Sequence, residues 1–404
     1  MSHRCLAAAL GVLAAVSAVV WLAPVPVAGQ APTGVAKTAG ATKDWAPPRT
    51  PWGAPDLQGM WDTRTRTPLE RPKEFGTREF MTDQEAAERA RRGGDAVIED
   101  EDASDALEKA DVRRAAQGDA PDDGRPGYRI AGAEYNAFWS SDPSRLKASR
   151  RTSQVVDPPD GRIPPLTREV LTRFEAREAA RRGRGESDSW EDRNVMERCL
   201  MRPGLPGEMI GSGQFPAKEI VQAPGQVTFV MSHGYVRIVP LDGRPHVGRA
   251  IRQWNGDSRG RWEGNTLVVE TTNFNDKQNG GPIMASRRPL VFYLGSGETL
   301  RVVERFTRLD PETIDYSYTV DDPKVYVRPW TAVNTWTLDD KQDRIFEYAC
   351  HEHNYGMVNL LKGGRANQKL SLEEAAREVP PRQKQIQAEW EKLRMWEAAQ
   401  RSSR

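Results

Sequence analysis

The sequence predicts a mainly β fold, an antiparallel barrel or sandwich with peripheral helices, and thus α+β overall. Between residues 220 and 350, short runs of β-branched and aromatic side chains alternate with turn residues, which is typical of antiparallel strands. Helix-capping residues predict helices before this region, and apolar residues with helical spacing predict a helix after it. We therefore expect one twisted antiparallel sheet that curls on itself and is flanked by helices.

Two hairpins carry the clearest strand pattern. Even-numbered residues from 300 to 306 and from 314 to 320 are mostly apolar, whereas their odd-numbered neighbours are mostly polar. Asp310-Pro311-Glu312 supplies the turn between these two runs. A second tight pair surrounds Glu263-Gly264-Asn265 and continues through 266–274. Further strands are expected near 226–240, 325–338 and 344–350.

The N-terminal part is predicted to begin as an extended segment and to continue as helices. Prolines and glycines in 47–59 (PPRTPWGAPDLQG) favour a surface strap, held in place by Trp52 and Trp61. Thr82 and Glu85 have the spacing of a capping box, which predicts a helix over 82–92. A second helix is expected over 167–182, with a threonine at its N-cap.

The C-terminal part is predicted to be helical. Ser371 and Glu374 have the spacing of another capping box, so a helix is expected to begin at Ser371. After Pro380-Pro381, apolar residues return with helical spacing, and this last helix is expected to dock on the sheet or on a partner. These apolar residues are Ile386, Trp390, Leu393 and Trp396.

The chain begins with the features of a secretory leader. Arg4 precedes an apolar run that ends at Ala23, and Pro24 and small residues follow. This order predicts an exported protein, periplasmic or extracellular, without a transmembrane span once the leader is removed. An uncleaved anchor is the alternative, because about 20 apolar residues can cross a bilayer.

The predicted organisation has five parts. They are a signal peptide at 1–30, an extended N-terminal strap at 31–78, a helix with an acidic mobile excursion at 79–127, a β-rich core domain at 128–365 and C-terminal helices at 366–404. The excursion is inferred from residues 95–127, which are acidic and have few large apolar side chains to pack.

Charge and motifs exclude several classes of partner and chemistry. Lys and Arg together number 58 and Asp and Glu together number 57, so the chain has no overall positive field for nucleic acid. The sequence has no Gly-Lys-Ser/Thr phosphate loop, no Gly-x-Ser-x-Gly elbow and no His-Glu-x-x-His helix. Nucleotide enzymes, α/β-hydrolases and zincins are therefore disfavoured.

Two cysteines remain after removal of the leader, Cys199 and Cys350. An even number of cysteines in an exported chain favours a disulfide. The alternative is a pair of separate buried thiols.

The candidate catalytic residues are His351, Glu352, Glu304, His233 and Arg237. Histidine suits acid or base chemistry near neutral pH, a carboxylate would orient it, and an arginine would balance an anionic group. Glu304 shares a strand face with apolar residues, and a buried position would suit it to proton transfer.

Two alternatives remain open for these residues. The structural explanation of Glu304 is a buried carboxylate held by Arg328, or an edge position where that strand face meets water. His351 and His353 lie two residues apart on a predicted strand and would face the same side, so they would chelate a metal ion if His233 or His246 completed the site. The sequence leaves the cofactor undetermined.

Aromatic residues are concentrated in the β-rich region, where they would line a pocket that stacks on a sugar or a flat organic ligand. The alternative is that they fill the core. The candidate ligand-binding residues are Arg244, His246, Trp254, Asp257, Trp330 and Tyr355.

Residues 256–274 read GDSRGRWEGNTLVVETTNF, and three further segments accompany them: PWGAPDLQG at 51–59, LDGRPH at 241–246 and YACHE at 348–352. Together they resemble an uncharacterised group of exported bacterial proteins. The resemblance covers most of the chain after the leader, and it implies no activity, ligand or catalytic residue that could be carried over.

Two classes of function follow from the sequence. The first is an exported enzyme that acts on a small organic or sugar-like substrate by acid/base chemistry. The second is a non-catalytic ligand-binding or envelope-associated structural protein. The two classes differ in whether His233, His351 and a carboxylate converge on one cleft. The sequence does not determine the oligomeric state.

Overall fold

The structure is a computed structural model. It describes residues 45–89 except 66, 149–193 except 181–186, 195, 197–200, 217–231, 235–277, 299–352 except 341–343 and 348, 354–375 and 381–402. The predicted signal peptide, the acidic excursion at 95–127, His233 and His353 lie outside these residues.

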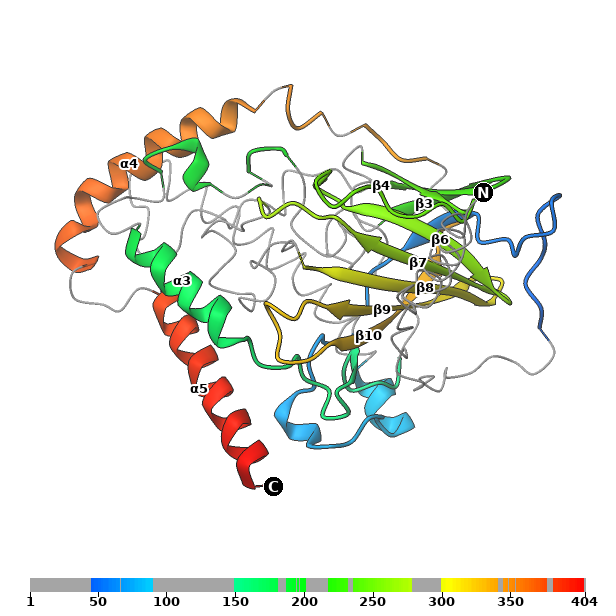
Figure 1. Cartoon of the computed structure of the whole chain (residues 1–404), viewed down its shortest axis with the longest axis horizontal. Helices are drawn as coiled ribbons and strands as arrows, with labels where there is room; N and C mark the ends of the chain where they lie inside the picture. The colour runs from blue at the N-terminus through cyan, green and yellow to red at the C-terminus, as the bar shows by residue number, and fades with distance from the viewer. Residues whose placement is uncertain are drawn as a thin grey trace, which may run out of the picture. The chain divides into compact units, whose positions relative to one another are not determined.

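Ten strands form one antiparallel sheet with the order β5-β4-β3-β1-β10-β9-β8-β7-β6, and β2 pairs with β10 beside this path (Figure 1). The strands are β1 (Gly59–Asp62), β2 (Val155–Asp157), β3 (Ala217–Ala223), β4 (Gln226–Met231), β5 (Val236–Pro240), β6 (Asp257–Glu263), β7 (Thr266–Thr272), β8 (Arg301–Asp310), β9 (Thr313–Asp321) and β10 (Trp330–Leu338).

The sheet curls into a nearly closed barrel. Its two end strands, β5 and β6, lie next to each other, although β5 pairs only with β4 and β6 only with β7 among the strands described. Gly260 of β6 permits this approach, because a Cβ there would lie 2.6 Å from Leu241 and 2.7 Å from Val239. We call the line between β5 and β6 the seam. The predicted mainly β fold is confirmed.

The two predicted hairpins are confirmed. In β8 and β9, Glu304 pairs with Tyr318 and Phe306 with Tyr316, so the even-numbered side chains share one face. This face is buried and forms much of the core, because residues two apart on a strand point the same way. Between β6 and β7, Gly264 and Asn265 make a two-residue turn in which the glycine has a φ of +61°.

The predicted strap contains a central strand. β1 lies between β3 and β10, and the fully buried Trp61 donates from its Nε1 to the carbonyl oxygen of Leu57 at 2.9 Å. Trp52 is 40% exposed, so it does not hold this segment as expected. A strand of four residues is too short to show a period of two in the sequence, which explains why β1 was missed. The strand expected over 344–350 is wrong for the residues described there.

Helix caps agree with the sequence in the N-terminal half. Residues 83–89 are helical. The Glu85 backbone N–H donates to the Thr82 hydroxyl, and the Thr82 N–H donates to the Glu85 carboxylate, so the predicted capping box is present. Helix α3 (Arg168–Ala180) begins after Thr167, whose hydroxyl accepts from the N–H of Val170. Short 3-10 turns occur at Lys73–Phe75 and Trp190–Asp192.

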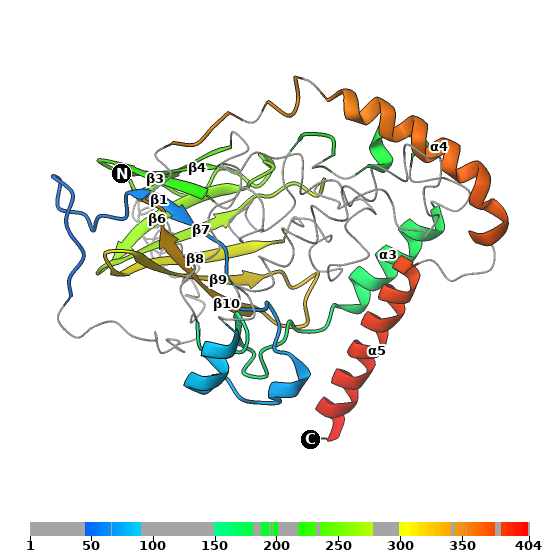
Figure 2. The same ribbon diagram turned by 180° about the vertical axis from the view of Figure 1, so that it is seen from behind.

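Helix α5 (Pro381–Ser402) lies alongside α3, as Figures 1 and 2 show. Ile386 and Leu393 are buried and belong to the same core cluster as Phe174 of α3. The indole of Trp390 donates to Glu175 at 2.7 Å. The last helix therefore docks within the chain as α5, but on α3 and not on the sheet or a partner as predicted.

Helix α4 (Tyr355–Ala375) passes through Ser371, so the helix start predicted there is wrong. The helix begins sixteen residues earlier, where the Asn354 side chain accepts from the N–H of Met357 at 3.2 Å. A capping-box spacing inside a continuous helix does not start a new one, because helical neighbours already supply the carbonyl acceptors.

None of the described helices is both long enough and apolar enough to cross a membrane.

Candidate functional site

The interior of the barrel contains a buried ion pair between Arg237 of β5 and Glu304 of β8. Arg237 Nη1 donates to Glu304 Oε1 at 3.0 Å, and Nη2 donates to Oε2. Arg237 is 4% exposed and Glu304 is fully buried. The sequence predicted both residues for one site, and the structure brings them together.

Hydroxyl groups complete the bonding around this pair. Arg237 Nε donates to Ser258 of β6 at 3.0 Å, and Nη2 donates to Thr271 of β7 at 2.8 Å. Tyr316 of β9 donates its hydroxyl to Glu304 Oε1 at 3.0 Å. Arg237 therefore joins β5 to β6, β7 and β8 across the seam. Both carboxylate oxygens of Glu304 accept hydrogen bonds from it. Arg328, the partner proposed from the sequence, instead pairs with Asp157.

An aromatic wall lies beside the ion pair on the inner face of β8, β9 and β10. The ring of Tyr316 lies 4.8 Å from Phe306, 5.5 Å from Tyr318 and 4.9 Å from Trp336, measured between centroids. Burial, followed by the negative charge of Glu304, raises the pKa of Tyr316 well above its ordinary value. Burial also raises the pKa of Tyr318. Both phenols therefore stay protonated at physiological pH.

Three polar groups of this wall have no hydrogen-bond partner among the described residues. They are the hydroxyl of Tyr318 and the Nε1 atoms of Trp330 and Trp336, and all three side chains are at least 99% buried. Tyr318 and Trp336 flank Tyr316, whose own hydroxyl is bonded to Glu304. Trp330, a predicted ligand-binding residue, is buried on the same face, with its ring edge-on to Tyr318 at 5.8 Å.

A second cluster lies on the outer side of the sheet, around His246 in the connection from β5 to β6. His246 Nδ1 lies 2.9 Å from Asp257 Oδ2, and its Nε2 lies 3.7 Å from Glu270 Oε1. Arg259 pairs with Asp257 at 2.8 Å and Arg301 with Glu270 at 2.5 Å. Two carboxylates and two guanidinium groups thus surround one imidazole, and their formal charges balance.

Burial acts to raise the pKa of Glu270, but the hydrogen bond and charge of Arg301, with the charge of His246, outweigh it. The pKa of Glu270 is therefore below its ordinary value, and this carboxylate is ionised near neutral pH. Asp257 Oδ2 also accepts from the N–H of Val247 at 3.0 Å, so Asp257 fixes both the imidazole and the loop that carries it.

The segment 256–274 (GDSRGRWEGNTLVVETTNF) holds the loop that carries His246. Gly256 has a φ of +69°, and a Cβ there would lie 2.5 Å from the carbonyl oxygen of Thr272. Asn273 has a φ of +59°, and its side-chain amide donates to the carbonyl oxygen of Val247 at 2.8 Å. Gly256 and Asn273 therefore have a structural role in holding the loop against β7.

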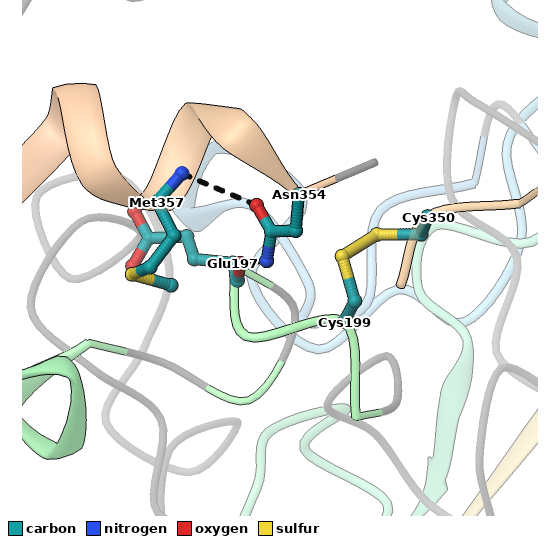
Figure 3. Close-up of a disulfide and its surroundings, with 5 residues drawn as sticks. All are labelled: Glu197, Cys199, Cys350, Asn354 and Met357. Atoms are coloured by element: carbon teal, nitrogen blue, oxygen red, sulfur yellow. Dashed lines mark hydrogen bonds between the residues drawn. A yellow bond between two sulfur atoms is a disulfide. The ribbon is translucent and has the colours of Figure 1, made fainter. Parts of the chain in front are cut away.

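The predicted disulfide between Cys199 and Cys350 is present, with a Cα–Cα distance of 5.6 Å (Figure 3). Asn354, which follows Cys350 closely in the chain, donates its side-chain amide to the carbonyl oxygen of Glu197 at 2.9 Å. The disulfide and this hydrogen bond tie the start of α4 to the segment before residue 200.

The other predicted site residues lie at the surface or outside the described part of the chain. His351 and Glu352 are exposed beside the disulfide, whereas Glu304 and Arg237 are buried inside the barrel, so these four do not form one site. Tyr355 is 73% exposed. The remaining two are the exposed Arg244, which pairs with Asp242, and the half-buried Trp254.

Sequence reasoning missed several residues of both clusters: Ser258, Thr271, Tyr316, Glu270, Arg259 and Arg301. For Ser258 and Thr271 a signal existed, because they are directly opposite across the predicted β6–β7 hairpin and their hydroxyls lie 2.9 Å apart. A matched pair of hydroxyls on the inner face of two strands indicates a buried polar group nearby.

The fold and its interior define a nearly closed antiparallel barrel with a neutralised ion pair and an aromatic wall inside. Within the described residues, no group of three His, Cys, Asp or Glu side chains is placed to hold a metal ion. No protein-family model matches the chain, and no curated protein or solved structure shows significant similarity to it.

Proposed function

We propose that the protein is an exported binding protein that holds a small organic ligand inside the barrel, beside Tyr316. The observation that carries this proposal is the set of three unpartnered groups, Tyr318 Oη, Trp330 Nε1 and Trp336 Nε1, on the buried aromatic wall. Leaving a buried polar group unpaired costs about 1 to 3 kcal/mol, so native interiors rarely retain one. A ligand that bonds to any of these groups would reduce this cost.

The site is suited to binding rather than to proton transfer. Both oxygens of Glu304 accept hydrogen bonds, and its charge is matched by Arg237 at bidentate distance. A carboxylate held in this way is a poor base, because abstraction of a proton would break the ion pair inside an apolar environment. The aromatic rings supply the apolar contact area that small organic ligands need.

A matched pair of variants tests, in the ligand-free protein, whether the Tyr318 hydroxyl lacks a hydrogen-bond partner. Tyr318→Phe removes an unpartnered hydroxyl, so we expect the free energy of unfolding in urea to stay the same or to rise by about 1 kcal/mol. Tyr316→Phe removes a donor to the buried Glu304 carboxylate and should lower that free energy by about 1.5 to 3 kcal/mol. Equal losses in the two variants would show that the Tyr318 hydroxyl has a partner, and the proposal would fail.

A thermal-shift panel of monosaccharides, aromatic acids and aromatic ketones tests binding itself. A compound that binds only the folded state raises the melting temperature. We expect at least one aromatic class to raise it in the wild type and to lose this effect in Trp336→Phe. A panel without any shift would count against a ligand site.

Export is part of the same proposal. It is supported by the leader pattern before residue 31 and by the Cys199–Cys350 disulfide, since disulfides persist in oxidising compartments. The resemblance to a group of exported bacterial proteins agrees with it. N-terminal sequencing of protein recovered from the periplasm or medium of a bacterial host should show cleavage near residue 30; an intact Met1 in the membrane fraction would contradict it.

A second candidate function, an acid/base enzyme, is favoured by the His246–Asp257 pair. A carboxylate on Nδ1 orients the ring and leaves Nε2, next to Glu270, able to take a proton. In ester hydrolysis, Nε2 would accept the proton of a water molecule as the water oxygen attacks the carbonyl carbon, and would return it to the departing alcohol.

Hydrolysis of 4-nitrophenyl acetate provides the assay for this second candidate. If His246 is the base, His246→Gln should lower kcat/KM at least tenfold, and Asp257→Asn should lower it while shifting the pH profile. A loss in His351→Gln alone would place the reaction at His351. A rate no higher than that of free imidazole at the same concentration would remove the enzyme candidate.

A further inference from the structure

We propose that the protein docks on the surface of anionic lipid bilayers through the loop between β5 and β6 and the adjoining outer face of β5. This proposal is independent of any ligand inside the barrel. It follows from exposed apolar side chains, from the arginines next to them and from the bonds that hold the loop in place. We call this region the docking surface, and its residues are Val236, Ile238, Arg244, Arg249, Ile251 and Arg252.

Apolar side chains are exposed along the outer face of β5. Val236 is 57% exposed and Ile238 is 53% exposed, and both point away from the barrel interior because Arg237 between them points into it. Thr228 of β4 pairs with Ile238 and also with the exposed Val221 of β3, so the apolar surface continues across these strands. A group of exposed apolar side chains on a sheet face indicates an interaction surface.

The loop between β5 and β6 exposes a further apolar residue. Ile251 is 57% exposed, and the loop that carries it leads into the first residues of β6. There Ser258 bonds to Arg237, which lies between Val236 and Ile238. Ile251 and the exposed side chains of β5 therefore belong to the same end of the barrel.

Hydrogen bonds hold this part of the loop in one conformation. The Asn273 side chain donates to the carbonyl oxygens of Val247 at 2.8 Å and Gly248 at 3.3 Å. The N–H of Ile251 donates to the carbonyl oxygen of Gly248 at 2.8 Å, and that of Gln253 donates to Asn273 at 3.0 Å. Because the loop is already ordered, binding through Ile251 costs little further conformational entropy.

Positive charge is in excess around Ile251. Arg249 and Arg252 are exposed on either side of it in the chain. Residues 241–256 contain these two arginines and Arg244, but a single acidic residue, Asp242, which pairs with Arg244. Anionic bilayers attract such arginines through their phosphate groups, and apolar side chains between the arginines can enter the headgroup region.

The apolar part of the docking surface favours a bilayer over a soluble polyanion. An anionic polysaccharide or a nucleic acid would bind to the arginines through its charged groups and would leave Val236, Ile238 and Ile251 in contact with water. A bilayer offers anionic phosphates to the arginines and an apolar layer to the other three side chains. Only the bilayer therefore uses both features of the surface.

Flotation with lipid vesicles tests the proposal. The mature chain is used, because the apolar leader would insert into vesicles by itself. We expect at least tenfold tighter binding to vesicles in which about a third of the lipid is phosphatidylglycerol than to vesicles of phosphatidylcholine alone. High salt should remove most of this preference, because it screens exposed charges. Equal binding to both kinds of vesicle would overturn the proposal.

A double variant tests the contribution of charge. Arg249→Gln/Arg252→Gln should weaken binding to the anionic vesicles at least fivefold, because it removes the two arginines that flank Ile251. Arg394→Gln/Arg401→Gln is the matched control, since it removes the same charge from exposed positions of α5. This control should change binding less than twofold. Equal effects of the two double variants would show that net charge alone determines binding, which contradicts a defined docking surface.

Two variants of Ile251 test insertion. Ile251→Ser should weaken binding to the anionic vesicles at least threefold, whereas Ile251→Trp should strengthen it by a similar factor, because indole rings favour the membrane interface. A gain of binding cannot result from misfolding. Val358→Ser, at an exposed apolar position of α4, is the control and should leave binding unchanged.

Heparin, an anionic polysaccharide, identifies the other kind of partner. If the chain binds heparin-coated beads but neither kind of vesicle, and Arg249→Gln/Arg252→Gln loses this binding, the partner is a soluble polyanion and the proposal is wrong. The proposal also fails if the chain binds neither vesicles nor heparin, or if vesicle binding is the same in the wild type and in every variant.

Discussion

Arg237 and Glu304 lie face to face inside the barrel, and their two hydrogen bonds cross the seam between β5 and β6. Along the main path of the sheet, backbone hydrogen bonds join each strand to its neighbours. Between β5 and β6, by contrast, the described residues form no β-ladder, and the side-chain bonds of Arg237 join the strands. The ion pair therefore takes the place of a missing β-ladder. Because the pair is fully bonded, its hydrogen bonds offset part of the cost of burying two charges.

Removing one charge of this pair should destabilise the fold more than removing both. Glu304→Gln leaves the Arg237 guanidinium buried without a counter-charge, and we expect a loss of about 3 to 5 kcal/mol in the free energy of unfolding. The double variant Arg237→Met/Glu304→Leu replaces both groups by apolar side chains and should recover at least half of that loss. Urea titrations followed by tryptophan fluorescence measure both values. A double variant no more stable than the single one would show that the seam needs the ion pair itself.

Two glycines with positive φ should respond differently to alanine. Gly264 lies in the turn between β6 and β7, and a Cβ there would meet no other atom within 4 Å, so Gly264→Ala should cost only the backbone strain of about 1 to 2 kcal/mol. Gly256 has similar backbone strain and in addition faces Thr272, Thr271 and Phe274 within 3.0 Å. We expect Gly256→Ala to lower the free energy of unfolding by at least about 1 kcal/mol more than Gly264→Ala does. Equal costs would indicate that the loop around His246 shifts freely.

Removal of the disulfide should lower stability without changing the barrel. Cys199 and Cys350 close a loop with a sequence separation of 151 residues, for which the chain-entropy model gives about 5 kcal/mol. Cys199→Ser/Cys350→Ser should therefore unfold at a lower urea concentration, while its far-ultraviolet circular dichroism stays that of the wild type. The reduced wild-type protein is the matched comparison and should behave as the variant does. Unchanged stability in both would mean that the unfolded chain is not restrained by this bond.

The stability of the protein should depend on pH through Asp315. Burial raises the pKa of this carboxyl to about 6, and the positive charge of Arg151 offsets only part of the effect. Between the ordinary value of 3.8 and about 6, the folded state binds more protons than the unfolded chain does, so stability falls as the pH rises through this window. Above it, the full cost of the buried charge applies.

Asp315→Asn removes that cost and should raise the free energy of unfolding at pH 8 by about 1 to 2 kcal/mol, allowing for solvent screening. At pH 4 the gain should nearly vanish, because the wild-type carboxyl is then already neutral in the folded protein. The exposed Asp160→Asn is the control and should show no such difference. A gain of equal size at both pH values would rule out titration of Asp315 as the cause.

Local patterns predicted the elements that depend on local physics. The alternation around Glu304 and Tyr318 indicated the β8–β9 hairpin, and the Thr82–Glu85 spacing predicted a capping box that both hydrogen bonds confirm. The spacing of Ile386 and Leu393 identified the buried face of α5. β1 and the full length of α4 were missed, because a four-residue strand shows no period and the start of α4 depends on the tertiary environment of Asn354.

The sequence by itself determined the mainly β class, the two hairpins and the pairing of the two cysteines, because alternation, turn chemistry and cysteine number act over short distances or require no geometry. It also placed Arg237 and Glu304 among the candidate residues. Only the tertiary structure decided that these two bond to each other across the seam, and that His351 lies outside on the surface. Register and barrel closure set which inner-face residues meet, and they depend on contacts between residues far apart in the chain.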